Sequence, residues 1–171
     1  MNADAINTLY HYHYGRLRQI WESIMTLTDA QFTQDVPYSL GSLRNQMVHL
    51  INDDSGWMTL MQGLEKPAPL NPQDYTTRAS VRAVYDRMEA DNLKFIASMS
   101  DTAIQREYIW HPPFTPEPQR LAAWQILVHV VNHGTDHRAQ ILRVLHDLGA
   151  PSFDQDLMGY LVQTGRTAIK P

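Results

Sequence analysis

The sequence predicts an all-α fold, a four-helix bundle with a short C-terminal helix, on three observations. Four long segments repeat apolar residues at intervals of three and four, proline and glycine separate these segments, and no convincing pair of strands is present. Helices that are apolar on one side bury that side against one another, which favours a bundle. The chain of 171 residues is long enough for one compact domain and too short for two of ordinary size, so we expect one domain over residues 1–171.

The first two predicted helices are defined by their apolar stripes and by the residues at their ends. Residues 6–27 carry one stripe, and a second runs over about residues 42–62, with Ser42 as its N-cap. Gly63 and Pro67 end this second helix. The linker KPAPLNP follows, because prolines cannot continue a helix.

The rest of the chain is expected to contain a third helix, a proline-rich loop, a long fourth helix and a short fifth one. The third helix is predicted over residues 78–99, and the sequences REYIW and HPPFTPEP then fit a short extended piece and a stiff loop. The fourth helix is predicted over about residues 119–148, because it can begin only after Pro118 and Gly149 lies just beyond its end. Residues 154–162 are predicted to form the fifth helix.

Composition and charge exclude several classes of protein. The 14 Lys and Arg residues against 18 Asp and Glu give a net charge of -4, and the basic residues are scattered, which argues against nucleic-acid binding. The chain has no cysteine, so disulfides and thiolate metal sites are excluded, and His, Asp and Glu remain as metal ligands. The N-terminal sequence lacks the features of a signal peptide, and no segment approaches the roughly 18 apolar residues of a membrane span. We therefore expect a soluble cytoplasmic protein.

Three histidines on the predicted fourth helix are spaced for metal binding. His129, His133 and His137 follow one another at intervals of four, so neighbouring pairs lie on one side of the helix, one turn apart. His137 falls inside the apolar arc of this helix and His133 at its border, whereas His129 falls outside and is expected to face solvent or to support the ligands. His133 and His137 are therefore the better candidate pair, and ordinary helix histidines are the alternative interpretation.

Two histidines bind a metal ion weakly by themselves, so a third ligand must come from another helix. The sequence HGTDH is not a zinc-protease motif, because Gly134 stands where the general-base glutamate would be. Glycine costs about 1 kcal/mol relative to alanine inside a helix, and close approach of another group is one explanation for its presence here.

His49 and His13 are the candidates for the third ligand. His49 lies on a polar strip of the second helix that flanks its apolar face, and periodicity alone does not select it. His13 lies within the apolar stripe of the first helix, where a core histidine bonded to a backbone carbonyl is the favoured interpretation. The remaining histidines are assigned no chemistry: His11, His111 and His146.

Arg138 is a separate anomaly, because it projects from the centre of the apolar arc of the fourth helix. A buried guanidinium requires polar partners. Asp53 or Asp54 on the second helix, or free carbonyls at a helix end, are the expected partners, and a structural role is favoured over a catalytic one.

Two stretches of the chain resemble the DinB/YfiT-like proteins, the damage-inducible family of four-helix bundles. The stretch SLRNQMVHLINDDSGWM resembles their second helix, and HVVNHGTDHRAQILRVLHDLGAPSFDQDLMGYL resembles their fourth helix and tail. The resemblance implies a bundle that holds one divalent metal ion through three histidines, which correspond here to His49, His133 and His137. The family often has a further histidine where this chain has Asp136, a departure that removes no ligand.

The resemblance also implies a partner and a range of activities. The family is usually dimeric, and its characterised relatives include thiol-dependent transferases and isomerases that use mycothiol or bacillithiol. We therefore expect a homodimer with a small-molecule substrate and one divalent ion, either zinc, nickel, iron or manganese. The expected activity is the transfer of a low-molecular-weight thiol to an electrophile, or a hydrolysis.

A catalytic site and a non-catalytic one are both compatible with three histidines. Three neutral imidazoles leave the charge of the ion uncompensated and at least one coordination position open, which favours catalysis. Tyr10, His13, Trp57 and Asp53 are the expected pocket residues, and no general base is assigned. The alternative is a non-catalytic dimeric bundle, metal-binding or stress-related, in which the ion is structural, sensory or adventitious.

Overall fold

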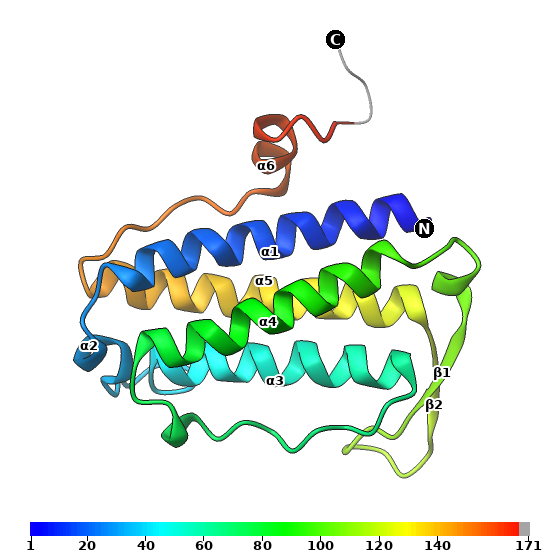
Figure 1. Cartoon of the computed structure of the whole chain (residues 1–171), viewed down its shortest axis with the longest axis horizontal. Helices are drawn as coiled ribbons and strands as arrows, with labels where there is room; N and C mark the ends of the chain where they lie inside the picture. The colour runs from blue at the N-terminus through cyan, green and yellow to red at the C-terminus, as the bar shows by residue number, and fades with distance from the viewer. Residues whose placement is uncertain (168–171) are drawn as a thin grey trace.

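The structure, a computed structural model, describes residues 1–167, so the last four residues of the predicted domain lie outside the described part. Four long helices dominate it, which confirms the predicted all-α four-helix bundle (Figure 1). These helices are α1 (Ala3–Met25), α3 (Leu43–Gln62), α4 (Arg78–Ala97) and α5 (Ala123–Asp147).

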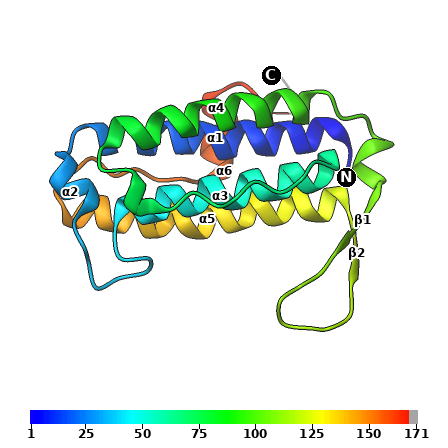
Figure 2. The same ribbon diagram turned by 60° about the horizontal axis from the view of Figure 1, so that its bottom comes forward.

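The four long helices pack in a closed arrangement around a shared core. Both α4 and α5 contact both α1 and α3, so α1 lies diagonally opposite α3 (Figures 1 and 2). The core is made by the apolar stripes that define the helices in the sequence, and its largest fully buried aromatic side chains are Trp21, Tyr10, Tyr14, Tyr85 and Phe32. The packing of α3 against α5 is the contact that matters for the candidate site.

Capping explains where the long helices begin and end. The Ser42 hydroxyl accepts a hydrogen bond from the Asn45 amide at the start of α3, as predicted, and Thr77 does the same at the start of α4. Gly63 ends α3 in the left-handed conformation at φ 67°, which glycine adopts without steric cost.

A two-stranded hairpin precedes α5, and the prediction that the chain contains no strand pair is therefore wrong. Strands β1 (Glu107–Trp110) and β2 (Gln119–Ala122) are antiparallel, with Trp110 opposite Gln119, and the proline-rich residues 111–118 form the loop between them. The predicted start of the fourth helix at residue 119 is also wrong, because the backbone there pairs with β1. The helix begins at Ala123, directly after β2.

Several short elements complete the described part of the chain. Helix α2 (Asp29–Thr33) was not predicted, because five residues are too few to show periodicity; a capping box between Thr28 and Gln31 begins it. Two 3-10 turns, η1 (Pro72–Asp74) and η2 (Ala103–Gln105), lie in the connections.

The predicted fifth helix is α6 (Leu157–Gln163), which packs against α1 (Figure 1). It begins after residue 154 because the Asp156 side chain caps it. Within residues 1–167, no helix is both long and apolar enough to cross a membrane.

Candidate metal centre

Three histidines from two adjacent helices meet at one point in the bundle. His49 comes from the middle of α3, and His133 and His137 lie one turn apart on α5. One ring nitrogen of each lies within 4.8 Å of those of the other two. The structure thus brings together all three residues that the sequence and the resemblance select, and we refer to them as the histidine cluster.

The spacing inside the histidine cluster fits a metal ion. The Nε2 atoms of His49 and His133 are 3.2 Å apart. Two nitrogens bound at about 2.0–2.1 Å to one tetrahedral ion would be about 3.3 Å apart. The ring centroid of His137 lies 4.5 Å from that of His49 and 4.4 Å from that of His133, so the third imidazole lies at the same point. The donor set of three imidazoles suits zinc, nickel, iron or copper better than magnesium or calcium.

A carboxylate lies beside the histidine cluster. Oδ2 of Asp53, one turn after His49 on α3, lies 3.0 Å from Nε2 of His49 and 3.3 Å from Nε2 of His133. The sequence prediction of Asp53 as a pocket residue thus agrees with its position. An anionic oxygen at this point can accept a hydrogen bond from either ring or from a molecule held between them.

Gln46 fixes the orientation of His137. Oε1 of Gln46 lies 2.7 Å from Nδ1 of His137, and its Nε2 donates to Gln140 at 3.0 Å and to Ser39 at 2.5 Å. Because the amide nitrogen of Gln46 is engaged as a donor, its oxygen accepts the proton of His137 Nδ1, which leaves Nε2 of that ring as the free electron pair. Such a partner behind a metal-binding histidine sets the tautomer and the ring orientation.

Gln46 was not singled out from the sequence, although a signal was present. It precedes His49 by three residues, and residues at this spacing share a helix face. A polar side chain on the same face as a candidate ligand is therefore a candidate support for a ligand on the neighbouring helix.

Two of the three imidazoles in the histidine cluster, those of His133 and His137, are neutral at pH 7. Burial, followed by the charges of the protonated His133 and His49, lowers the pKa of His137 to about 4. Burial also lowers the pKa of His133, against the opposing effect of Asp53. Neutral imidazoles have the free electron pairs that metal binding requires.

His13 does not belong to the histidine cluster but packs next to it, against Gly134 on α5. A Cβ at position 134 would overlap Cε1 of His13 and lie 2.6 Å from its Nδ1. The close approach that was one explanation for this glycine is therefore present. Any side chain at position 134 would push the His13 ring out of its place.

Arg138 is fully buried, but its predicted partners are wrong. Its guanidinium donates to Gln155 at 3.0 Å, to Thr135 at 2.7 Å and to Nδ1 of His13 at 2.7 Å, and it contacts neither Asp53 nor Asp54 directly. Instead, Nε2 of His13 lies 3.1 Å from Oδ2 of Asp54.

The imidazole of His13 thus bridges two buried charges. Burial lowers the pKa of His13 against the opposing effect of Asp54, so the ring is neutral at pH 7. Its Nδ1 accepts from Arg138 and its Nε2–H donates to Asp54, which distributes the ion pair over α5, α1 and α3. The interpretation as a core histidine agrees with this position, although its partners are charged side chains and not a carbonyl.

Two of the four predicted pocket residues line a cavity beside the histidine cluster. Asp53 and Trp57 on α3 face a cavity of about 360 Å³, together with Lys66 from the following linker and with Trp110 and His111 from the hairpin. We call this the indole cavity. The sequence did not indicate the three residues from outside α3, because only the fold brings the linker and the hairpin to this helix.

The other two predicted pocket residues, Tyr10 and His13, are fully buried in the core. The Tyr10 hydroxyl donates to the backbone oxygen of Leu127 at 3.2 Å. His129 is exposed, as one of its two interpretations required, and its ring centroid lies 5.3 Å from that of Trp57 and 5.9 Å from that of His133. It stands at the rim between the indole cavity and the histidine cluster.

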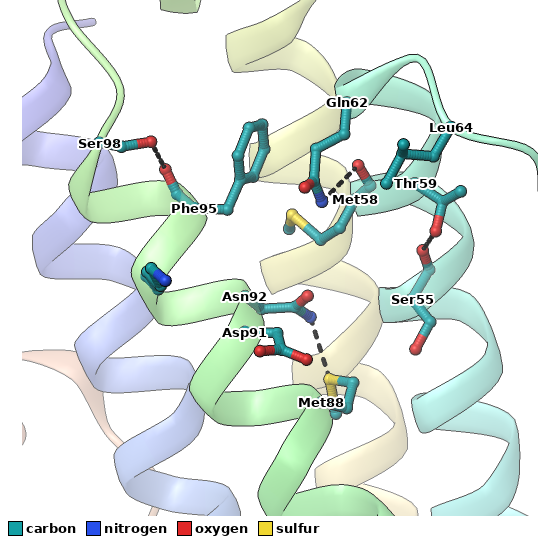
Figure 3. A pocket seen from close by; sticks show the side chains of 11 residues that line it. Ser55, Met58, Thr59, Gln62, Leu64, Met88, Asp91, Asn92, Phe95 and Ser98 are labelled. Atoms are coloured by element: carbon teal, nitrogen blue, oxygen red, sulfur yellow. Dashed lines mark hydrogen bonds between the residues drawn. The ribbon is translucent and has the colours of Figure 1, made fainter.

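A second, larger cavity lies between α3 and α4, apart from the histidine cluster (Figure 3). Its volume is about 540 Å³, and Met58, Phe95, Asn92 and Lys94 are among the residues that line it. We call it the α3–α4 cavity. It contains none of the predicted site residues.

Comparison with known proteins identifies relatives along almost the whole chain. The model of the DinB family matches residues 1–168. The protein DinB of Bacillus subtilis is 24% identical over 166 residues, which cover 95% of this chain and 96% of that protein.

Solved structures of similar proteins share the fold. A DinB-like protein from Bacillus cereus superimposes with a TM-score of 0.63 at 14% identity, over 81% of this chain and 89% of that one. YfiT from Bacillus subtilis, described as a probable metal-dependent hydrolase with an unusual four-helix bundle topology, gives 0.57 at 17% identity, over 84% and 85%. A DinB family member from Shewanella denitrificans gives 0.52 at 16% identity, over 92% and 87%.

Proposed function

Because this chain belongs to the DinB family, we propose that it is a divalent-metal-dependent enzyme that acts on a small molecule. His49, His133 and His137 are the proposed ligands. The observation that carries the proposal is the meeting of three imidazoles at one point, next to a cavity large enough for a substrate. The description of YfiT as a probable metal-dependent hydrolase supports the same class of activity.

The chemistry that such an ion supplies is a lowered pKa for a bound water molecule or thiol, which makes either a nucleophile near neutral pH. By accepting the proton of His137 Nδ1, Gln46 leaves Nε2 of that ring free to hold the ion. Asp53, with Oδ2 near both His49 and His133, would accept a hydrogen bond from such a nucleophile and orient it toward the indole cavity.

The nucleophile is either water, which gives a hydrolase, or a low-molecular-weight thiol, which gives an S-transferase. The chain has no cysteine, so a thiol must come from a second substrate. Assays of the metal-loaded protein with esters and amides, and with glutathione, bacillithiol or mycothiol plus a panel of electrophiles, distinguish the two. Turnover that requires a thiol supports the transferase, and turnover in water alone supports the hydrolase.

The metal site is tested by metal analysis of protein purified without a nickel column. We expect one divalent ion per chain in the wild type and in His146→Ala, a matched exposed histidine near the end of α5, and none in His49→Ala. Substoichiometric metal in the wild type would contradict the proposal.

The rival function is a non-catalytic, dimeric metal-binding bundle. The two differ in what metal loss does to the fold, because a structural ion contributes directly to folding. An unchanged melting temperature of His49→Ala favours catalysis, whereas global unfolding favours a structural ion. A homodimer and a cytoplasmic location stay predictions, and light scattering of the purified protein tests the first.

A further inference from the structure

The indole cavity joins the histidine cluster to two aromatic side chains from different elements. The rings of Trp57 on α3 and Trp110 on β1 lie 5.5 Å apart at an interplanar angle of 52°. The hairpin that carries Trp110 lies at the end of the bundle where α3 finishes and α5 begins (Figure 1). Asp53 lines the same cavity while its Oδ2 contacts His49 and His133, so a molecule in the cavity lies beside the proposed metal site.

The same two indoles also border a smaller, mostly apolar cavity. Its volume is about 190 Å³, and Leu121, Gln125, Ile126 and His129 complete its lining. An apolar cavity of about 150 Å³ is large enough to hold benzene. The space around Trp57 and Trp110 therefore suits a six-membered ring, which indoles bind through offset-stacked or edge-to-face contacts.

Lys66 supplies a positive charge to the indole cavity. A Cβ at Gly56 would lie 3.5 Å from Cε and 3.9 Å from Nζ of Lys66, so the lysine side chain lies alongside α3 at the position of this glycine. Within residues 1–167, no carboxylate forms an ion pair with Lys66. Asp53, the acidic residue of the same cavity, is already engaged by His49 and His133. The Lys66 ammonium is therefore the charged group of this cavity that is left without a partner among residues 1–167.

We propose that the indole cavity binds an aryl carboxylate, with the aromatic ring against Trp57 and Trp110 and the carboxylate on the Lys66 ammonium. This substrate class rests on the proposed function, since it presumes that molecules in the cavity react at the histidine cluster. Binding of the aryl carboxylate to the cavity, however, requires no metal ion. An exposed ion pair of this kind contributes about fivefold to affinity or less, and the contribution decreases with salt.

The test measures the affinity of matched charged and neutral ligands. The probes are 3-phenylpropanoate and its primary amide, titrated into the metal-free and the zinc-loaded protein and followed by ligand-observed NMR. The metal-free protein is needed because a bound ion also attracts carboxylates. We expect the acid to bind the metal-free wild type about three- to fivefold more tightly than the amide at low salt.

Two variants assign the selectivity to its residues. Lys66→Gln should bring the acid-to-amide ratio to about one, while Lys94→Gln, in which the lysine of the α3–α4 cavity is changed, should leave it unaltered. Trp110→Ala should weaken both probes by a similar factor, because it removes ring contacts and no charge.

Three outcomes would overturn the proposal: equal affinities in the metal-free wild type, a ratio that persists in Lys66→Gln, or tighter binding of phenylpropylammonium than of either probe. The last would assign the cavity to cations through Asp53. Selectivity that appears only with zinc would refute the role of Lys66 and leave the proposed function intact. Selectivity for the acid in a protein that binds no stoichiometric metal would support the role of Lys66 and refute the proposed function.

Discussion

Nδ1 of His13 accepts a hydrogen bond from the buried guanidinium of Arg138 over 2.7 Å, and this contact connects α1 to α5. The other ring nitrogen of His13 continues the connection to Asp54 on α3. The two helices that carry the histidine cluster are thus joined through the core by a neutral ring between two opposite charges. A core residue outside the histidine cluster therefore links the two helices that carry the proposed ligands.

We predict that His13→Ala destabilises the protein by about 3–5 kcal/mol, because it leaves Arg138 and Asp54 buried without their shared partner. Urea denaturation of the metal-free protein measures this loss. His146→Ala, an exposed substitution on α5, should change the free energy of unfolding by less than about 0.5 kcal/mol. A loss below about 1 kcal/mol in His13→Ala would show that the bridge contributes little.

Gly134→Ala should destabilise the protein although alanine favours helices. The new methyl group would occupy the space of the His13 ring, and such overpacking costs about 1–3 kcal/mol, more than the gain of about 1 kcal/mol in helix propensity. Gly159→Ala in α6 is the control, since its Cβ would meet nothing closer than 3.5 Å. Thermal melts should show a lower midpoint for the first variant and an equal or higher one for the second. The reverse order would refute the packing argument.

Gln46→Leu should weaken zinc binding by about 10–100-fold, because it removes the acceptor that orients His137. Gln46→Glu keeps an acceptor oxygen at this position and should lose much less. Competition with a chromophoric chelator measures both affinities, and urea denaturation of the metal-free variants reports any loss of fold. Equal affinities for the two variants would exclude an orienting role.

The metal-free protein should lose stability as the pH falls from 6.5 toward 4. The pKa of His137 is about 4 in the folded protein and about 6.5 in the unfolded chain, so between these values only the unfolded chain binds the proton. The contribution of the neutral His137 side chain to the free energy of unfolding is complete above pH 6.5 and decreases as the pH is lowered. Urea denaturation at pH 5.0, 5.75 and 6.5 should show a shallower pH dependence in His137→Gln than in the wild type. Parallel slopes would be inconsistent with the lowered pKa.

The sequence predicted the four long helices because their apolar stripes and caps are local signals. Ser42 and Gly63, for example, mark the two ends of α3 by properties of single residues. It predicted an extended piece where β1 lies but missed β2 and the pairing, because strands of four residues are too short for a convincing alternation and pair only across the proline loop.

The candidate site was predicted unevenly for a related reason. His133 and His137 share one helix face, so spacing selects them, whereas His49 lies on a different helix and was chosen by resemblance. Lys66 and Trp110 meet Trp57 only after the linker and the hairpin are folded against α3. Contacts between elements that are distant in the sequence leave no periodic pattern.

Strand β2 continues directly into α5, so the hairpin loop at residues 111–118 is the part of this region that can vary without a shift of the helix. A longer loop at residues 111–118, or one of different sequence, would change the indole cavity next to Trp57. The helices that carry the histidine cluster would keep their positions. A change of this loop can therefore alter which molecules fit the indole cavity without a change in the histidine cluster.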